Sequence, residues 1–401
     1  MKKLFLTCAV AVFALSTAMA QVVHTPTMGK TGISLYNYPS FRTEIILPQV
    51  KGYNIYKGDF HVHTIYSDGE VTPRERVREA WYDGLDIISI TDHYEGQKGL
   101  KNTMKVLAPM NEDGKPTPIP STSKTGKVWA DFNEIHNQAA AQVERSGFPM
   151  LLIKGCEMAR NAKTHGHYNC LFLKDINGLY NKDMAEAFRN VKKQGGLIIH
   201  NHPAWRRKTS DKTEFHNQVY GEGLIDGVEV VNGTTFYPHI VRRCIDEKLT
   251  MFANTDEHGL TAYRFGTTDY YRTMTLVMAK DLTEKAVKDA ILKRRTIAYS
   301  GGCLIGEEEW LNELLNESVV CHVVKEDAKA GKRTYMLTNM SSFTYKLRRG
   351  KTIYELEPFK SLQVNFSKDK NSGKYVLPKF TVDNMWIVDY KHPVFEIKLD
   401  K

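Results

Sequence analysis

The sequence lacks the features of a disulfide-stabilised protein, of a nucleic-acid-binding arm and of a multispanning membrane protein. Of its six cysteines, Cys8 falls in the N-terminal apolar run, and the other five are an odd number at irregular spacing, which does not make a disulfide framework. The formal net charge is +9, but the basic residues are scattered, so no nucleic-acid partner is indicated. After the N-terminal run, no stretch is long and apolar enough to span a bilayer.

Two signatures of covalent catalysis are also absent. The sequence contains no Gly-x-Ser-x-Gly elbow and no reactive-cysteine motif. This absence argues against hydrolysis through a serine or cysteine intermediate. No internal repeat or low-complexity tract stands out either.

The first twenty residues have the composition of a secretory signal peptide. Lys2 and Lys3 precede an apolar run over residues 4–15, and Ala18-Met19-Ala20 gives a small-x-small cleavage site. We therefore expect residues 1–20 to be removed after Ala20 and the mature protein to be periplasmic or secreted.

The first candidate metal ligands lie at the end of an apolar, extended segment, in the motif Asp59-x-His61-x-His63. Side chains alternate along a strand, so His61 and His63 point to one face. Ser67-Asp68-Gly69 then turns the chain and adds a carboxylate. Imidazole and carboxylate ligands together suit zinc, manganese or iron.

Ligand-type residues recur at the ends of four further apolar segments. These residues are Asp92 and His93, Glu157, His200 and His202, and Asp256 and His258. A satisfied core histidine is common once, but this repetition favours a site for more than one divalent ion. A carboxylate such as Glu157 can bridge two ions, and Glu229 and Asn232, at the end of another strand, are expected to orient the ligands.

This series of motifs resembles the polymerase-and-histidinol-phosphatase (PHP) superfamily of metal-dependent phosphoesterases, over residues from about 53 to 300. It is also similar to the secreted phosphodiesterase-like branch of Gram-negative bacteria. The matching pieces are Asp59-x-His61-x-His63 with Ser67-Asp68-Gly69, Thr91-Asp92-His93, Gly155-x-Glu157, His202-Pro203 and Asp256-x-His258.

The resemblance implies two or three divalent ions, manganese, zinc or iron, and a role for each ligand. It implies a first ion at His61, His63, Glu157 and Asp256, a second at Asp68, His93 and His202, and a third at Glu157, His258 and a histidine near the fourth strand. That histidine is His165 or His167, and His167 is preferred because it abuts the strand. His200 is either an orienting residue or a core histidine. The expected catalytic residues are Glu157, Asp256 and His202.

The expected activity is hydrolysis of a small phosphodiester or phosphomonoester by a metal-bridging hydroxide that attacks phosphorus. Arg160, Arg206 and Arg264 each follow a ligand segment and are candidates for binding the phosphate, although any single one of them is more often a solvated surface residue. Two alternatives remain open: a non-catalytic binding protein stabilised by metal, and a metal-dependent amidohydrolase. The oligomeric state is not indicated.

Alternating strands and helices predict an α/β fold with about seven parallel strands and the site at their C-terminal ends. The resemblance implies a distorted (β/α)7 barrel over residues 51–304. Residues 21–50 are expected to form an extended arm, and residues 98–128 a long insertion. After Gly301-Gly302 the pattern changes to alternating segments, which predict a small antiparallel β-sandwich-like domain over 305–401 that supplies no ligands.

Overall fold

The computed structural model describes residues 42–95 and 131–400. The expected signal peptide (1–20), most of the expected arm (21–50) and the expected insertion (98–128) lie outside the described residues. Within the described part of the chain, no helix is both long and apolar enough to cross a membrane.

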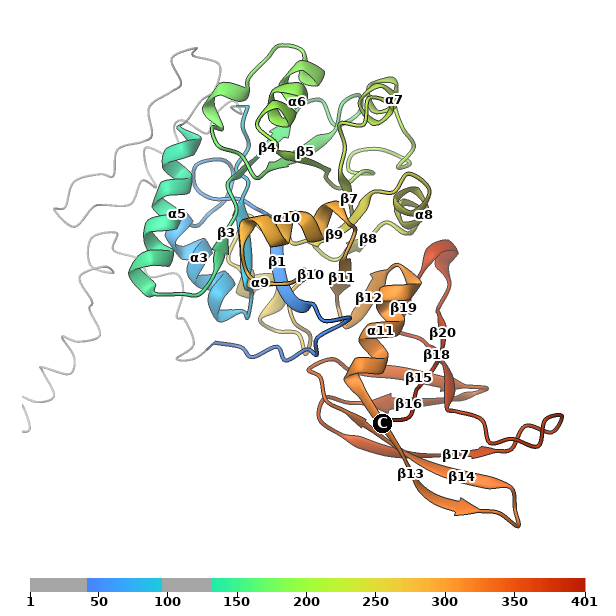
Figure 1. The fold of residues 1–401 in the computed structure, drawn as a ribbon. Helices are drawn as coiled ribbons and strands as arrows, with labels where there is room; N and C mark the ends of the chain where they lie inside the picture. The colour runs from blue at the N-terminus through green and yellow to red at the C-terminus, as the bar shows by residue number, and fades with distance from the viewer. Residues whose placement is uncertain (1–41, 96–130, 401) are drawn as a thin grey trace, which may run out of the picture.

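The ligand-bearing segment lies in the middle of a seven-stranded mixed sheet (Figure 1). This segment, β1 (Asn54–Val62), pairs in parallel with β2 (Ile87–Ile90) and antiparallel with β10 (Met274–Ala279). In spatial order the strands are β19 (Met385–Trp386), β12 (Cys303–Gly306), β11 (Thr296–Ser300), β10 (Met274–Ala279), β1 (Asn54–Val62), β2 (Ile87–Ile90) and β3 (Leu151–Leu152).

A second mixed sheet carries the remaining strand ends of the site. Its strands are β4 (Gly155–Ala159), β5 (His167–Leu171), β6 (Leu197–His200), β7 (Gly227–Asn232) and β8 (Thr235–Phe236), with β9 (Thr250–Asn254) also paired to β7. Isolated parallel bridges join His93 to Glu157 and Val62 to Glu257. These two bridges bring the ends of β1 and β2 against the ends of β4 and β9.

The expected barrel of parallel strands is not confirmed. The chain has an α/β fold with two mixed sheets, and the described residues show no closed barrel. Pairing is antiparallel for β4–β5, β5–β6, β1–β10, β10–β11 and β11–β12. Parallel neighbours need a crossover of about a dozen residues or more. The short connection from Ala159 to His167 cannot supply one, so β5 returns antiparallel to β4.

Helices surround the two sheets (Figure 1). They are α3 (Pro73–Tyr82), α5 (Phe132–Ser146), α6 (Met184–Lys193), α7 (Glu214–Gly221), α8 (Pro238–Asp246), α9 (Thr261–Phe265), α10 (Glu284–Leu292) and α11 (Glu308–Ser318), with 3-10 turns at Asn177–Leu179 and Val388–Tyr390. The first of them, α3, begins where the sequence indicates: the Thr72 side chain accepts a hydrogen bond from the Glu75 amide, and Pro73 occupies the first turn.

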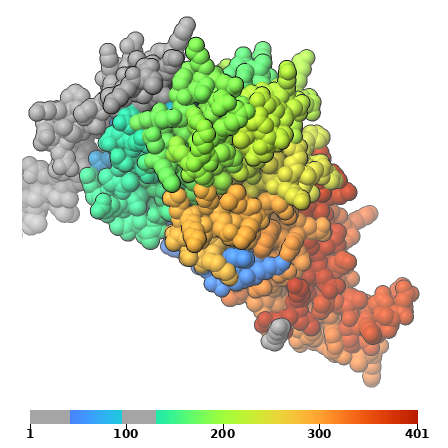
Figure 2. Space-filling view, turned by 45° about the horizontal axis from the view of Figure 1, so that its top comes forward, coloured from blue at the N-terminus to red at the C-terminus, as the bar shows by residue number. Residues whose placement is uncertain are grey.

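The last part of the chain forms two antiparallel sheets, which extend away from the main body (Figures 1 and 2). One contains β13 (Val319–Asp327), β14 (Lys332–Asn339) and β17 (Ser361–Ser367), and the other β16 (Thr352–Leu356), β15 (Tyr345–Arg349), β18 (Lys379–Val382) and β20 (Val394–Glu396). Tyr335, Tyr345 and Phe380 are buried among them. The predicted boundary after residue 304 falls inside β12, and β19 returns to pair with that strand.

Candidate metal centre

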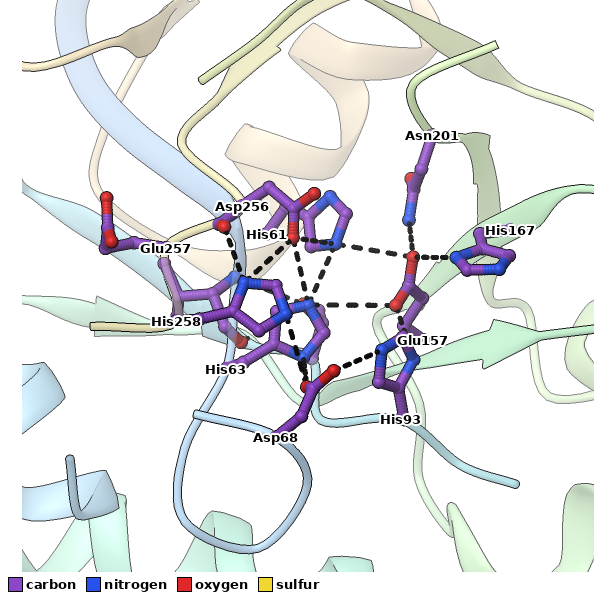
Figure 3. Close-up of polar contacts among 12 residues, drawn as sticks. His61, His63, Asp68, His93, Glu157, His167, Asn201, Asp256, Glu257 and His258 are labelled. Carbon is purple, nitrogen blue, oxygen red and sulfur yellow. Dashed lines mark hydrogen bonds and ion pairs between the residues drawn. The ribbon is translucent and has the colours of Figure 1, made fainter. Parts of the chain in front are cut away.

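The end of β1 presents the paired histidines to one side of the strand (Figure 3). Both imidazoles are fully buried, and the Nε2 atoms of His61 and His63 lie 3.1 Å apart. The Nδ1 atom of His61 lies 2.8 Å from Glu229 Oε1. With Nδ1–H donating to that carboxylate, the Nε2 lone pair of a neutral His61 is free to bind a cation. Glu229 also accepts hydrogen bonds from the His202 amide and the Asn232 side chain, so the predicted orienting role of Glu229 and Asn232 agrees with the geometry.

Glu157, in the middle of β4, lies at the centre of the cluster. Its carboxylate is within 3.7 Å of a ring nitrogen of five histidines: His61, His63, His93, His167 and His202. The Asn201 amide donates to Oε1 over 2.8 Å and fixes the carboxylate. Burial opposes ionisation of Glu157, but the positive potential of His93, His61 and His167 outweighs it and holds the pKa well below its usual range.

Asp256 and His258 arrive from the segment after β9. Asp256 Oδ1 lies 3.2 Å from His61 Nε2 and 3.1 Å from His63 Nε2. The backbone turns here with a φ of 52° at Asp256, in the left-handed region that non-glycine residues seldom adopt. The Asp256 amide donates to the His61 carbonyl over 2.8 Å, which ties this turn to β1.

Asp68 closes the cluster from the turn after β1. Its oxygens lie 3.2 Å from His258 Nε2 and 3.3 Å from His93 Nε2. Burial opposes ionisation, but the neighbouring His258 and His93 rings outweigh it and hold the pKa of Asp68 well below its usual range. The next residue must be glycine, because a Cβ on Gly69 would lie 2.7 Å from the backbone of His63 and Thr64.

The donor set fits divalent metal ions. The donors form four overlapping groups, and within each group the ligand atoms lie within 4.8 Å of one another. Together the groups contain all nine predicted ligands. His93 Nδ1 lies 2.7 Å from Glu157 Oε2, yet both atoms are buried without a hydrogen bond, as is Asp68 Oδ1. Buried polar atoms normally have partners. A bound divalent cation would satisfy these converging nitrogen and oxygen atoms.

The geometric groups divide the donors differently from the family-based expectation. The groups are His63, Asp68, His93 and His258; His61, His63 and Asp256; His61, Glu157 and His202; and His93, Glu157 and His167. His202 therefore lies with His61 rather than with Asp68 and His93, and His258 lies with Asp68 rather than with Glu157.

The structure distinguishes the two histidines left open on the fourth-strand segment. His167 Nδ1 lies 3.4 Å from Glu157 Oε1, whereas His165 contacts Thr164 and packs on Phe215 outside the cluster. His200, whose role was also open, belongs to none of the donor groups, and its Nδ1 lies 2.7 Å from the Tyr220 hydroxyl.

Asp92, expected among the ligand-type residues, and Asp59, part of the recognised motif, belong to no donor group and have supporting roles that the sequence did not reveal. Asp92 accepts hydrogen bonds from the Thr64 amide and hydroxyl and from the Ser67 hydroxyl, and so holds the turn that carries Asp68. Asp59, part of the recognised motif, pairs with the buried Arg272 over 2.7 Å rather than joining the donor groups. The partners of these carboxylates are remote in sequence, so no local signal reveals them.

The three candidate arginines have different surroundings. A cavity of about 660 Å³ opens over the cluster and is lined by Arg160, Arg206 and Lys163, among others. The exposed Arg206 guanidinium lies 4.3 Å from the Trp205 ring centroid, and no ion pair to it occurs within the described ranges. Arg160 instead pairs with Glu95 and donates to backbone carbonyls. Arg264 is not among the lining residues and donates to the Thr255 carbonyl over 3.1 Å.

Comparison with known proteins agrees with the donor set. Residues 59–234 match the PHP domain family. A crystal structure from Bacteroides vulgatus, described as a two-domain protein containing a predicted PHP-like metal-dependent phosphoesterase, is 30% identical with a TM-score of 0.77, over 90% of this chain and all of that one. None of the curated proteins matches.

Two further solved structures have lower sequence identity and lower TM-scores. A putative metal-dependent phosphoesterase from Bifidobacterium adolescentis is 15% identical over 64% of this chain and 98% of that one, with a TM-score of 0.36. A lesion-specific endonuclease from Pyrococcus furiosus is 13% identical over 75% of this chain and 64% of that one, with a TM-score of 0.37. Similarity at this level does not indicate a shared substrate. On the strength of the donor cluster and the Bacteroides vulgatus similarity, this chain belongs to the PHP-like metal-dependent phosphoesterases.

Proposed function

We propose that the protein is an exported enzyme that hydrolyses a small phosphodiester or phosphomonoester. One observation carries the proposal: six histidines and three carboxylates converge beneath a cavity whose wall carries the cationic side chains of Arg206 and Lys163. A phosphate ester needs both parts, a polarising centre for phosphorus and cations for its non-bridging oxygens.

The nine donors would hold two or three divalent ions, manganese, zinc or iron. When bound, such ions lower the pKa of a water and neutralise charge on the phosphoryl oxygens. Glu229 keeps the His61 ring in the tautomer whose Nε2 faces the cluster, and Asn201 fixes Glu157. Arg206, placed by its contact with Trp205, binds the phosphate at the rim.

Glu157, Asp256 and His202 are the residues on which turnover depends most. Glu157 belongs to two donor groups, so its loss would disturb both. Asp256 Oδ1 lies close to both His61 and His63, and His202 lies 3.5 Å from Glu157 Oε1. With no serine or cysteine signature in the sequence, the water attacks phosphorus directly and no phosphoenzyme forms.

The stereochemical course tests this mechanism. A chiral thiophosphate ester hydrolysed in oxygen-labelled water should give inversion at phosphorus, because a single displacement inverts and two displacements retain. Activity itself is tested on protein loaded with manganese or zinc against a panel of aryl phosphodiesters and monoesters. Metal binding without hydrolysis of any ester would favour a binding protein, and amide hydrolysis alone would favour an amidohydrolase.

Two further parts of the proposal concern the organisation of the chain. The Bacteroides vulgatus relative is described as a two-domain protein, which supports a catalytic part over residues 51–304 and a β-rich part over 305–401. All nine donors precede residue 301. We assign the β-rich part a supporting role, without a ligand for the ions.

A further inference from the structure

Arg76, on helix α3, is a fully buried arginine directly behind the donor cluster. Its Nε and Nη2 groups donate to the His63 carbonyl over 3.1 and 2.8 Å. Nη2 also approaches the carbonyls of Glu257 and His258, each at 3.2 Å, and Nη1 donates to the Gly259 carbonyl over 2.9 Å. One planar guanidinium therefore contacts four backbone carbonyls.

These carbonyls belong to the two segments that carry the donors His63 and His258. His63 directly follows β1, and the segment 257–259 follows Asp256 and contains His258. The two segments also contact each other directly, since the His63 amide donates to the Glu257 carbonyl over 3.0 Å. The rings of His63 and His258 stack with centroids 4.2 Å apart. Arg76 thus fixes the separation of two backbones whose side chains face a common donor group.

Glu79, one helical turn further along α3, completes the arrangement. Its Oε2 accepts from Arg76 Nη1 over 2.8 Å, and its Oε1 accepts from the Thr261 amide over 2.9 Å. A buried charge is tolerated only when it is paired and hydrogen-bonded. Because Glu79 neutralises Arg76 and also holds Thr261, the pair clamps the whole segment after β9 onto α3.

We infer that Arg76, supported by Glu79, is a positioning residue that sets the metal affinity of the group formed by His63, Asp68, His93 and His258. The inference rests on the proposed metal site. Arg76 touches no donor atom and acts only through the carbonyls of the segments that carry His63 and His258. Lysine cannot replace it, because one ammonium group with three donors cannot span four carbonyls held by a planar fork.

The test compares Arg76→Lys with Arg295→Lys. Arg295 is a matched control, since it is also buried, donates to the Met278 carbonyl and pairs with Asp289 away from the cluster. Apoprotein is titrated with manganese or zinc by equilibrium dialysis, at a temperature where circular dichroism shows each variant folded. Loss of an orienting contact around a metal site typically weakens affinity about 10- to 100-fold. We expect a loss in that range at one class of site for Arg76→Lys, and less than about twofold for Arg295→Lys.

The outcomes separate this inference from the proposed function. Wild-type protein that binds no metal would overturn the proposed metal site itself. Wild-type protein that binds metal, with Arg76→Lys binding equally well, would overturn only the role of Arg76. Equal loss in Arg76→Lys and Arg295→Lys would show a general effect of stability and also overturn it. If Arg76→Lys does not fold, Glu79→Gln removes one of the two acceptors and should shift affinity in the same direction, and unchanged affinity would count against the inference.

Discussion

His93 and Glu157 meet both through their backbones and through their side chains. They form an isolated parallel bridge between the two large sheets, and His93 Nδ1 lies 2.7 Å from Glu157 Oε2. Backbone hydrogen bonds from Tyr94 to the Glu157 carbonyl and from Glu157 to the Asp92 carbonyl flank the contact. The donor cluster is therefore built across the junction between the sheets, and its geometry depends on how they meet.

We expect Glu157→Gln to be the most damaging single change. Its carboxylate lies near five histidine rings, so an amide there removes a donor from two groups at once. Turnover should fall at least about a thousandfold, which corresponds to roughly 4 kcal/mol of transition-state stabilisation. Elemental analysis should show lower metal content.

Glu95→Gln is the control for this change, because Glu95 lies just after His93 but pairs with Arg160 outside the donor groups. It should retain turnover within about tenfold. A Glu157→Gln variant with full metal content and near-normal turnover would contradict the central role of this carboxylate.

Arg206→Ala should weaken substrate binding more than it slows the chemical step. The guanidinium lines the cavity and stacks on Trp205, and it belongs to none of the donor groups. We expect KM to rise by about tenfold and kcat to change by only a few-fold. The reason is that Arg206 would contact the substrate equally in the ground state and in the transition state, so its loss weakens binding and leaves the chemical step almost unchanged. Steady-state kinetics with an aryl phosphodiester measures both.

Arg333→Ala is a matched control for Arg206→Ala, because Arg333 also stacks on an aromatic ring, 3.9 Å from the centroid of Tyr375, but lies on β14. It should leave KM unchanged. An unchanged KM in Arg206→Ala would remove this residue from the substrate site.

The stability of the protein should fall between neutral and mildly acidic pH partly because of His216. Burial, assisted by Arg207, lowers the pKa of His216 from 6.5 to about 4. Its Nδ1 accepts from the Thr213 amide in the capping box of α7, which requires the neutral ring. The unfolded chain takes up a proton below pH 6.5 while the folded chain does not, so stability is lost from about pH 6.5 down to about pH 4 and then levels off.

Urea denaturation at pH 7 and pH 5 measures this contribution. His216→Gln, which cannot be protonated, should lose less stability than the wild type over that interval. Equal losses in the two proteins would show that His216 makes no such contribution.

His392→Ala should leave metal content and turnover within a few-fold of the wild type. Its Nδ1 lies 2.9 Å from the Met385 carbonyl and its ring packs on Trp386, outside the donor groups. The same holds for Glu357→Ala. A loss of a hundredfold or more from either, in protein that circular dichroism shows to be folded, would mean that the C-terminal part enters the site.

Export should be accompanied by cleavage after Ala20. The basic start, the short apolar run and the Ala-x-Ala ending carry this expectation. Mass spectrometry of the protein recovered from the periplasm or medium should show Gln21 as the first residue. A mature population that keeps Met1 would contradict it.

The donor residues could be predicted because each is encoded locally. His61 and His63 share a face through the two-residue period of a strand, and Glu157 and His93 follow apolar runs of strand length. The pairing of the strands could not be predicted from the sequence. Whether β1 pairs with the antiparallel β10 or with another parallel strand depends on contacts between residues far apart in sequence. A distant contact also explains why the sequence made Arg160 a candidate for binding phosphate. Its ion-pair partner, Glu95, lies across the junction between the sheets and is remote in sequence.

The pairing of β19 with β12 has a consequence for the order in which the protein can be completed during synthesis. Strand β12 emerges from the ribosome long before Met385 and Trp386. Until then, the backbone groups of β12 that face β19 have no partner, and an unpaired edge is where nascent chains associate. The sheet that carries His61 and His63 is therefore finished only after Met385 and Trp386 have been translated, about 80 residues after β12.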